Sequence, residues 1–184
     1  MRITVSGLTQ AQAKIAAMAA RVRDMRPIMA EGAASIVTLI DDAFRQQREP
    51  GGKPWQGLAG PRDMMRDGKR VHVPGTIERR LARKKSMSAK RRAAAAGSEK
   101  ILIDTGRLRL SNFAQSFPRS IKFGTNVIYA ATQQLGRGAI PARPFLPVTQ
   151  VGGKFVLTET GPAGVAFQKI RARIHEFITN GSVR

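Results

Sequence analysis

The sequence predicts an α+β fold, with a small, mostly antiparallel sheet flanked by helices, an N-terminal helical arm and a basic, mobile loop. Three observations lead to this prediction. Apolar residues recur at helical spacing from Leu8 to Phe44 and again from Ala163 to Ile178. Short apolar runs bounded by turn residues lie between positions 100 and 158, as in the strands of a small sheet. A basic segment without a regular pattern separates these parts.

The length of 184 residues suffices for one domain with a hydrophobic core. We divide the chain into an N-terminal helical region of two helices (1–48), a basic loop region with a short helix (49–99) and an α+β core with a C-terminal helix (100–184). The 32 Lys and Arg residues against 12 acidic ones give a formal net charge of +20, which predicts attraction to polyanions or to an acidic protein surface. No run is apolar enough to span a bilayer, so we expect a soluble protein of the cytoplasm, or of something assembled there, with no membrane partner.

The N-terminal region predicts a short strand at 3–5 and helices at about 8–25 and 27–47. Thr9 is a plausible N-cap of the first helix. Apolar positions three and four residues apart give a seam that is interrupted at Pro27, where the helices are either kinked or folded as a hairpin. The seam suits core packing within the chain or an arm that packs against a neighbouring subunit.

The segment 49–99 predicts a loop around Trp55 and then a basic block. Trp55, the only tryptophan, serves either as a core anchor or as an interface residue. A short helix is expected at 76–85, and the residues after it are expected to be mobile when free. The block contacts either the phosphates of a nucleic acid, without reading its sequence, or a protein partner. The residues assigned to polyanion contact are Arg79, Arg80, Arg83, Lys84, Lys85, Lys90, Arg91 and Arg92.

The α+β core begins with a predicted buried strand at 100–104. Asp104 or Thr105 is expected to cap a short helix at 107–114. A second strand is expected at 117–124, with the side chains of Ile121 and Phe123 on one face and Lys122 on the other. A helix at 127–136 follows, capped by Asn126 and ended by Gly136 in the left-handed conformation.

Prolines hold the segment from Gly136 to Val148 extended, so that Phe145 and Leu146 are presented as fixed anchors. Gly152-Gly153 predicts a hairpin turn before a strand at 153–158. The last helix is expected to be capped by Thr160, with Pro162 in its first turn. Its predicted apolar face comprises Ala163, Ala166, Phe167, Ile170, Ile174, Phe177 and Ile178.

Catalytic and metal sites are not indicated. The chain has no cysteine, which excludes disulfides, thiolate metal sites and cysteine catalysis. His72 and His175 are isolated in sequence, and no phosphate-binding loop or nucleophile elbow occurs. We therefore predict that the protein is not an enzyme and has no cofactor.

Three short motifs occur in order within residues 104–146. They read DTGRLRLS from Asp104, FGTNVIYAATQQLG from Phe123 and IPARPFL from Ile140. Together with a tryptophan and a basic region upstream, they resemble the phage virion morphogenesis family of Mu-like tailed phages, also described as tail completion proteins. Gln133 or Gln134 stands where that family often has His, and Pro147 stands where Gly is usual.

The resemblance implies a structural protein of the virion that completes or terminates the tail and joins it to the DNA-filled head. It further implies assembly in the host cytoplasm as a homo-oligomeric ring, most often a hexamer. The expected partners are neck proteins of the connector or stopper type, the tail tube protein and, by non-specific contact, genomic DNA in the channel. The interface residues expected on this basis are Arg143, Pro144, Phe145, Leu146, Trp55 and Tyr129.

Two alternatives stay open at the level of sequence. The charge also fits a basic, non-specific DNA-binding or scaffold protein of phage assembly that forms no ring. Arg143 and Phe145 also fit a turn and a core plug that close the sheet.

Overall fold

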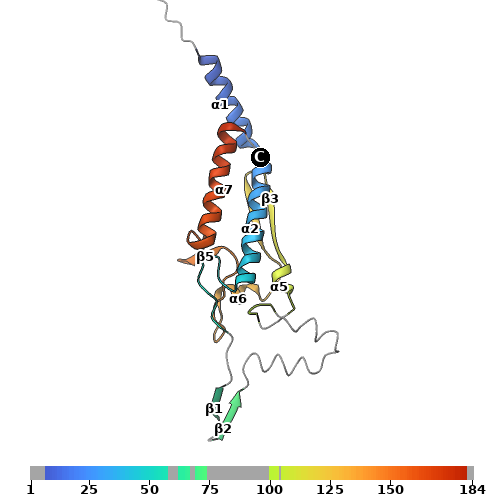
Figure 1. The fold of residues 1–184 in the computed structure, drawn as a ribbon, viewed down its shortest axis with the longest axis vertical. Helices are drawn as coiled ribbons and strands as arrows, with labels where there is room; N and C mark the ends of the chain where they lie inside the picture. Colours follow the sequence, from blue (N-terminus) through green and yellow to red (C-terminus); the bar gives the residue numbers. More distant parts are fainter. Residues whose placement is uncertain (1–6, 58–61, 67–68, 74–99, 104, 182–184) are drawn as a thin grey trace, which may run out of the picture.

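The computed structural model describes residues 7–57, 62–66, 69–73, 100–103 and 105–181. Figure 1 shows two long helices side by side, with short hairpins beside them, a further hairpin apart from them and one helix projecting beyond their ends. The α+β class is confirmed. The elements are α1 (Leu8–Arg23), α2 (Arg26–Gln46), β1 (Arg62–Arg66), β2 (Lys69–Val73), α5 (Arg107–Leu110), β3 (Asn112–Phe117), β4 (Ser120–Thr125), α6 (Ala130–Leu135), β5 (Val148–Val151), β6 (Lys154–Leu157) and α7 (Gly161–Asn180).

The two N-terminal helices match the predicted ranges closely, and they meet at a kink. The break falls at Asp24 and Met25, with Pro27 in the first turn of α2. The carboxylate of Asp24 accepts hydrogen bonds from the backbone N–H and the guanidinium of Arg26. α1 then extends past the end of α2 without folding back on it (Figure 1). The predicted cap at Thr9 is wrong, because Gly7 in the left-handed conformation precedes the helix.

The core forms where α2 packs against α7 and the β3–β4 hairpin. The buried side of α2 includes Ile28, Ile36, Ile40 and Phe44, spaced four or eight residues apart. Gly32 lies on the same side, and a Cβ there would approach the Ile121 side chain to 2.8 Å. The predicted apolar face of α7 is confirmed, since each of its residues is buried or partly buried.

The strands form three separate two-stranded antiparallel hairpins in the described part of the chain, β1–β2, β3–β4 and β5–β6. The prediction of one shared sheet is therefore wrong. The predicted strand at 153–158 and its Gly152-Gly153 turn are confirmed as β6 and the turn before it, but β6 pairs with the unpredicted β5. The β1–β2 hairpin lies in a region predicted to be an irregular loop.

Residues 100–103 of the strand predicted at 100–104 form a turn instead. Leu102 has a φ of 60°, which a strand cannot contain. Gln47 supplies what a neighbouring strand would supply, because its side-chain amide accepts from the N–H of Ile101 and donates to the carbonyl of the same residue. The apolar run still packs against the core through Ile101 and Ile103. The sequence predicted correctly that this segment packs on the core, but the predicted backbone conformation was wrong.

The predicted helix at 107–114 ends at Leu110, and the chain continues as β3. Asn112 ends the helix by donating from its amide to the carbonyls of Leu108 and Arg109. The predicted strand at 117–124 is confirmed only from Ser120 onward, because a tight turn follows Phe117. The expected opposition of Ile121 and Phe123 to Lys122 is confirmed by their burial.

Helix caps were the least accurate predictions. α6 begins at Ala130, so Asn126 does not cap it. Gly136 follows α6 with a positive φ of 76°, but its ψ of 162° is not left-handed helical. Thr160 occupies the N-cap position of α7 with Pro162 in the first turn, yet its side chain makes no capping hydrogen bond. Thr105 accepts a long hydrogen bond from the N–H of Arg107, while Gly106 holds the cap position.

Several predicted features lie outside the described residues. They are the strand at 3–5, the helix at 76–85, the mobile residues after it, the possible cap at Asp104 and all eight residues assigned to polyanion contact. The division into three regions likewise stays a prediction.

We expect Phe44→Ala to lower the free energy of unfolding by ~3–5 kcal/mol, because the buried ring leaves a cavity between two other aromatic rings. Val37→Ala is the control on the exposed side of the same helix and should cost ~0.5 kcal/mol or less. Urea denaturation followed by circular dichroism measures both. Equal losses in the two variants would contradict the position of Phe44 at the centre of the core.

Candidate functional site

Three aromatic residues from distant parts of the chain meet in the core. The ring centroids of Trp55 and Phe145 each lie 5.5 Å from that of Phe44. Phe145 is fully buried, and the indole N–H of Trp55 donates to the carbonyl of Pro144 at 2.7 Å. The sequence motif around Phe145 thus closes the core of its own chain, as one of the two alternatives expected.

Gln134 fixes the segment that follows Phe145. Its buried side-chain oxygen accepts from the backbone N–H groups of Phe145 and Leu146, both at 3.0 Å. Its side-chain nitrogen donates to the carbonyls of Leu146 and Val148 at 3.3 and 3.2 Å. One amide therefore satisfies four backbone groups between Phe145 and Val148, the first residue of β5.

Arg143 ties the same segment to the loop after Trp55. Its Nε donates to the carbonyl of Gln56 at 2.9 Å and one Nη to that of Gly57 at 3.0 Å. Gly136 permits the close approach of the backbone at Ala142, since a Cβ on Gly136 would lie 2.8 Å from the backbone nitrogen of Ala142. Pro144 and Leu146 are half-buried beside these contacts.

Among the residues expected at an interface, Tyr129 is the one that lies exposed in the chain. It sits at the start of α6 beside Ile128, which is almost fully exposed. Leu135 and Ile140 are also exposed nearby in sequence. An interface role for the six expected residues stays a prediction, and five of them already make internal contacts or are half-buried.

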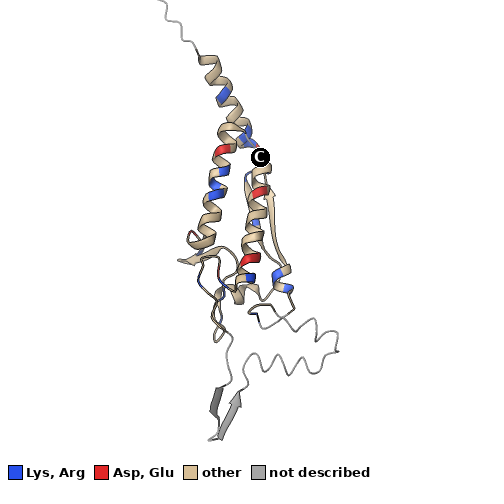
Figure 2. Ribbon diagram, viewed as in Figure 1, with Lys and Arg blue, Asp and Glu red and all other residues tan. Residues whose placement is uncertain are grey.

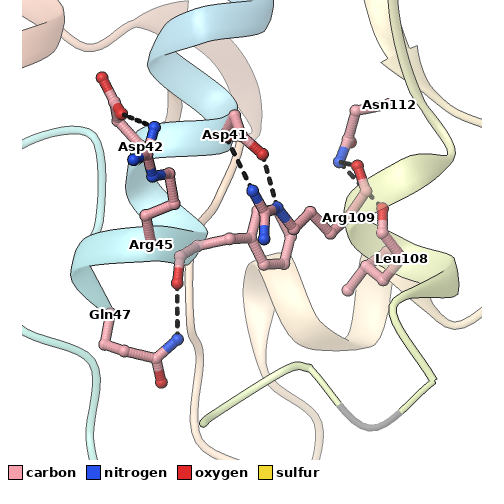
Figure 3. Close-up of polar contacts among 8 residues, drawn as sticks. Asp41, Asp42, Arg45, Gln47, Leu108, Arg109 and Asn112 are labelled. Carbon is pink, nitrogen blue, oxygen red and sulfur yellow. Dashed lines mark hydrogen bonds and ion pairs between the residues drawn. The ribbon is translucent and has the colours of Figure 1, made fainter. Parts of the chain in front are cut away.

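A second polar junction joins the C-terminal half of α2 to α5 (Figure 3). The carboxylate of Asp41 receives two hydrogen bonds from the guanidinium of Arg109, at 2.5 and 2.9 Å. This paired contact holds the pKa of Asp41 below its ordinary value. Gln47 donates to the carbonyl of Phe44 one turn further along, where α2 ends.

α1 has no buried side chain. Its apolar seam is open to solvent, with Ile15 exposed by 66% and Leu8 by 57%. The C-terminal end of α1 is fixed by Arg21, whose guanidinium donates to the carbonyls of Ile178 and Thr179 at the end of α7. A cation at a helix C-terminus also interacts favourably with the helix dipole.

Metal and membrane sites find no support in the described residues. No group of three or more His, Asp or Glu side chains gathers there, and His175 is exposed on α7. No described helix combines the length and apolar character needed to cross a membrane.

A model described as the phage virion morphogenesis family matches residues 6–160. The chain belongs to the phage virion morphogenesis family. The match runs from two residues before α1 to the residue before α7, and includes all three motifs that carry the resemblance. Neither a curated protein nor a solved structure matches the chain significantly.

Family membership gives the protein a role in building a phage virion, and it indicates a structural rather than a catalytic protein. Sequence reasoning missed Gln134 as the anchor of the extended segment. The available signal was its spacing of four residues from Ala130, which places both on one side of α6 and both in the core.

We expect Gln134→Met to lower the free energy of unfolding by ~2–4 kcal/mol, because two buried N–H groups lose their acceptor while the side-chain volume is kept. Gln133→Met is the adjacent control, since no side-chain hydrogen bond of Gln133 occurs among the described residues. Thermal and urea unfolding measure both. A loss confined to Gln133→Met would contradict the anchoring role.

For Asp41 we expect a carboxyl pKa below 3.8 in the intact protein and a return toward that value in Arg109→Gln. A lowered pKa in the folded state stabilises it above the ordinary carboxyl pKa, and the contribution disappears as the pH falls through the lowered value. NMR titration of the carboxyl carbon tests this. Arg107→Gln, which removes an exposed cation from the same short helix, should leave the pKa of Asp41 unchanged.

Proposed function

We propose that the protein is a tail completion or tail terminator component of the phage neck, which forms a ring at the head–tail junction. Membership of the virion morphogenesis family carries the proposal. The open seam of α1 is the structural observation that supports assembly. We also propose that the role involves no catalysis.

The seam of α1 supports contact between subunits because an isolated helix of 16 residues is only marginally stable in water. Full burial of a Leu, Ile or Val side chain contributes ~1.5–3 kcal/mol. Leu8, Ile15 and Val22 lie along one side and are all exposed. Arg21 fixes the base of the helix, so the arm projects from a defined position and can pack on a neighbour.

The charge supports a place near DNA. A net charge of +20 favours non-specific contact with phosphates, which suits a ring through which the genome passes. We assign this contact to the basic residues between Arg79 and Arg92, and propose the connector or stopper and the tail tube protein as neighbours along the neck. The same charge favours the second candidate, a monomeric DNA-binding or scaffold protein of phage assembly.

Multi-angle light scattering separates the two candidates. The tail terminator should assemble without DNA, either alone or on purified tails. When it assembles alone, light scattering should give a species near six times the 20.0 kDa chain mass at both low and high salt. Ile15→Asp should weaken the assembly because it places a charge in the seam, whereas Gln12→Asp, at an already polar exposed position, is the matched control. A monomer that binds duplex DNA in a salt-dependent manner and has no affinity for tails would establish the second candidate instead.

A further inference from the structure

The first strand of the β3–β4 hairpin has its large apolar side chains on the outside, whereas Ile121 and Phe123 of β4 face the core. Along β3, Asn112, Ala114 and Ser116 are the partly buried residues, whereas Phe113, Gln115 and Phe117 are exposed. Phe113 and Phe117 remain 41% and 40% exposed. An antiparallel sheet with one face in water normally shows the opposite alternation. The outer face of this hairpin is therefore built for contact with something apolar.

The β5–β6 hairpin carries apolar side chains on both faces. The register places Leu157 opposite Val148 and Phe155 opposite Gln150 on one face, and Val156 opposite Thr149 on the other. Every residue of β6 is exposed, including Phe155 at 58%. A strand with consecutive apolar residues is typical of burial on both faces, and an isolated two-stranded hairpin is marginally stable in water.

The root of the β5–β6 hairpin is nevertheless fixed. Pro147 is fully buried, and its carbonyl accepts from the N–H of Thr158 at 3.0 Å. Gln134 donates to the carbonyl of Val148. A hairpin held at its base presents its side chains at low entropic cost, which favours association.

Charge indicates which partner these surfaces fit. In a chain with net charge +20, two copies repel each other except where few cations lie. The outer face of β3–β4 carries Lys122 as its one charge, and β5–β6 carries Lys154. β3 itself has no charged residue (Figure 2). An acidic partner or DNA would favour cationic surfaces, whereas a second copy favours these two.

The two surfaces also lie on different sides of the subunit. In the view of Figure 1, β3 and β5 stand on opposite sides of α2. A contact between two different surfaces of identical chains is heterologous, and it closes into a ring when the rotation between neighbours allows.

We propose that the β5–β6 hairpin of one copy packs on the outer face of the β3–β4 hairpin of the next, with Phe155 against Phe113 and Phe117. The inference rests on the proposed ring and names the contact that builds it. Packing of the two hairpins face to face buries aromatic and aliphatic side chains that neither copy buries alone.

Cysteine cross-linking tests this contact cleanly, because the chain has no cysteine of its own. Gln115→Cys and Gln150→Cys place thiols on the two faces without touching the aromatic residues. A short bismaleimide should give covalent dimers when the two single variants are mixed, and few or none with either variant alone. The variant with both cysteines should give a ladder of covalent oligomers. Gln168→Cys, exposed on α7, replaces Gln150→Cys in the control mixture and should not cross-link with Gln115→Cys.

Phe155→Asp provides the second measurement. It should reduce the light-scattering mass from the ring to the 20.0 kDa monomer while circular dichroism and the melting temperature stay near those of wild type. Val165→Asp, an exposed apolar position on α7, is the control and should leave the mass unchanged.

The outcomes separate this contact from the proposed function. A ring that persists in Phe155→Asp and shows no link between positions 115 and 150 overturns the contact and leaves the tail terminator in place. Cross-linking of position 150 to a tail protein in place of a second copy also overturns the contact. A wild-type chain that stays monomeric both alone and on tails overturns the ring and the contact together.

Discussion

Burial of Phe145 between segments that are distant in sequence is the interaction on which the rest of the fold depends. Its ring contacts Phe44 at the end of α2, and Trp55 also packs against Phe44. The indole N–H of Trp55 in turn donates a hydrogen bond to the carbonyl of Pro144. Phe44 and Phe145 are fully buried and Trp55 nearly so, and buried aromatic rings bring large contact areas to a core. The described hairpins share no sheet, so β3–β4 is held by Ala114, Ile121 and Phe123 against the core, and β5–β6 by the segment that follows Phe145.

A second constraint follows from charge. A net charge of +20 opposes association of copies, yet the family builds virions, which requires stable contacts between proteins. The described ion pairs join elements of one chain, as Asp41 joins Arg109 and Glu31 joins Arg173. They use part of the limited supply of acidic side chains internally. The proposed contacts between copies would then depend on apolar surface, which the structure exposes on α1, on β3 and on β5–β6.

Helical periodicity predicted the long elements well, because α2 and α7 each carry an apolar side that the core buries. Local strand signals failed where a side chain replaced a strand. The run at 100–103 is apolar, but the amide of Gln47 pairs with Ile101 and leaves no need for a ladder. The caps assigned to Thr9 and Asn126 were wrong because α1 begins after Gly7 and α6 after Tyr129, and neither helix has a side-chain cap. The apolar outer face of β3 was missed because Phe113 was assigned to a helix.

The motif residues and the proposed contact are connected through the root of the β5–β6 hairpin. Gln134 bonds the backbone from Phe145 to Val148, so the position of β5 is set by an amide in α6 and by a ring in the core. Gln134, Arg143 and Phe145 of the motifs YAATQQLG and PARPFL are buried, and they hold an exposed hairpin in one place. A motif can therefore be specific to an assembly protein while several of its side chains lie in the core. In the proposed contact, such residues determine where the contacting surface lies, and the exposed residues of the hairpin determine what it binds.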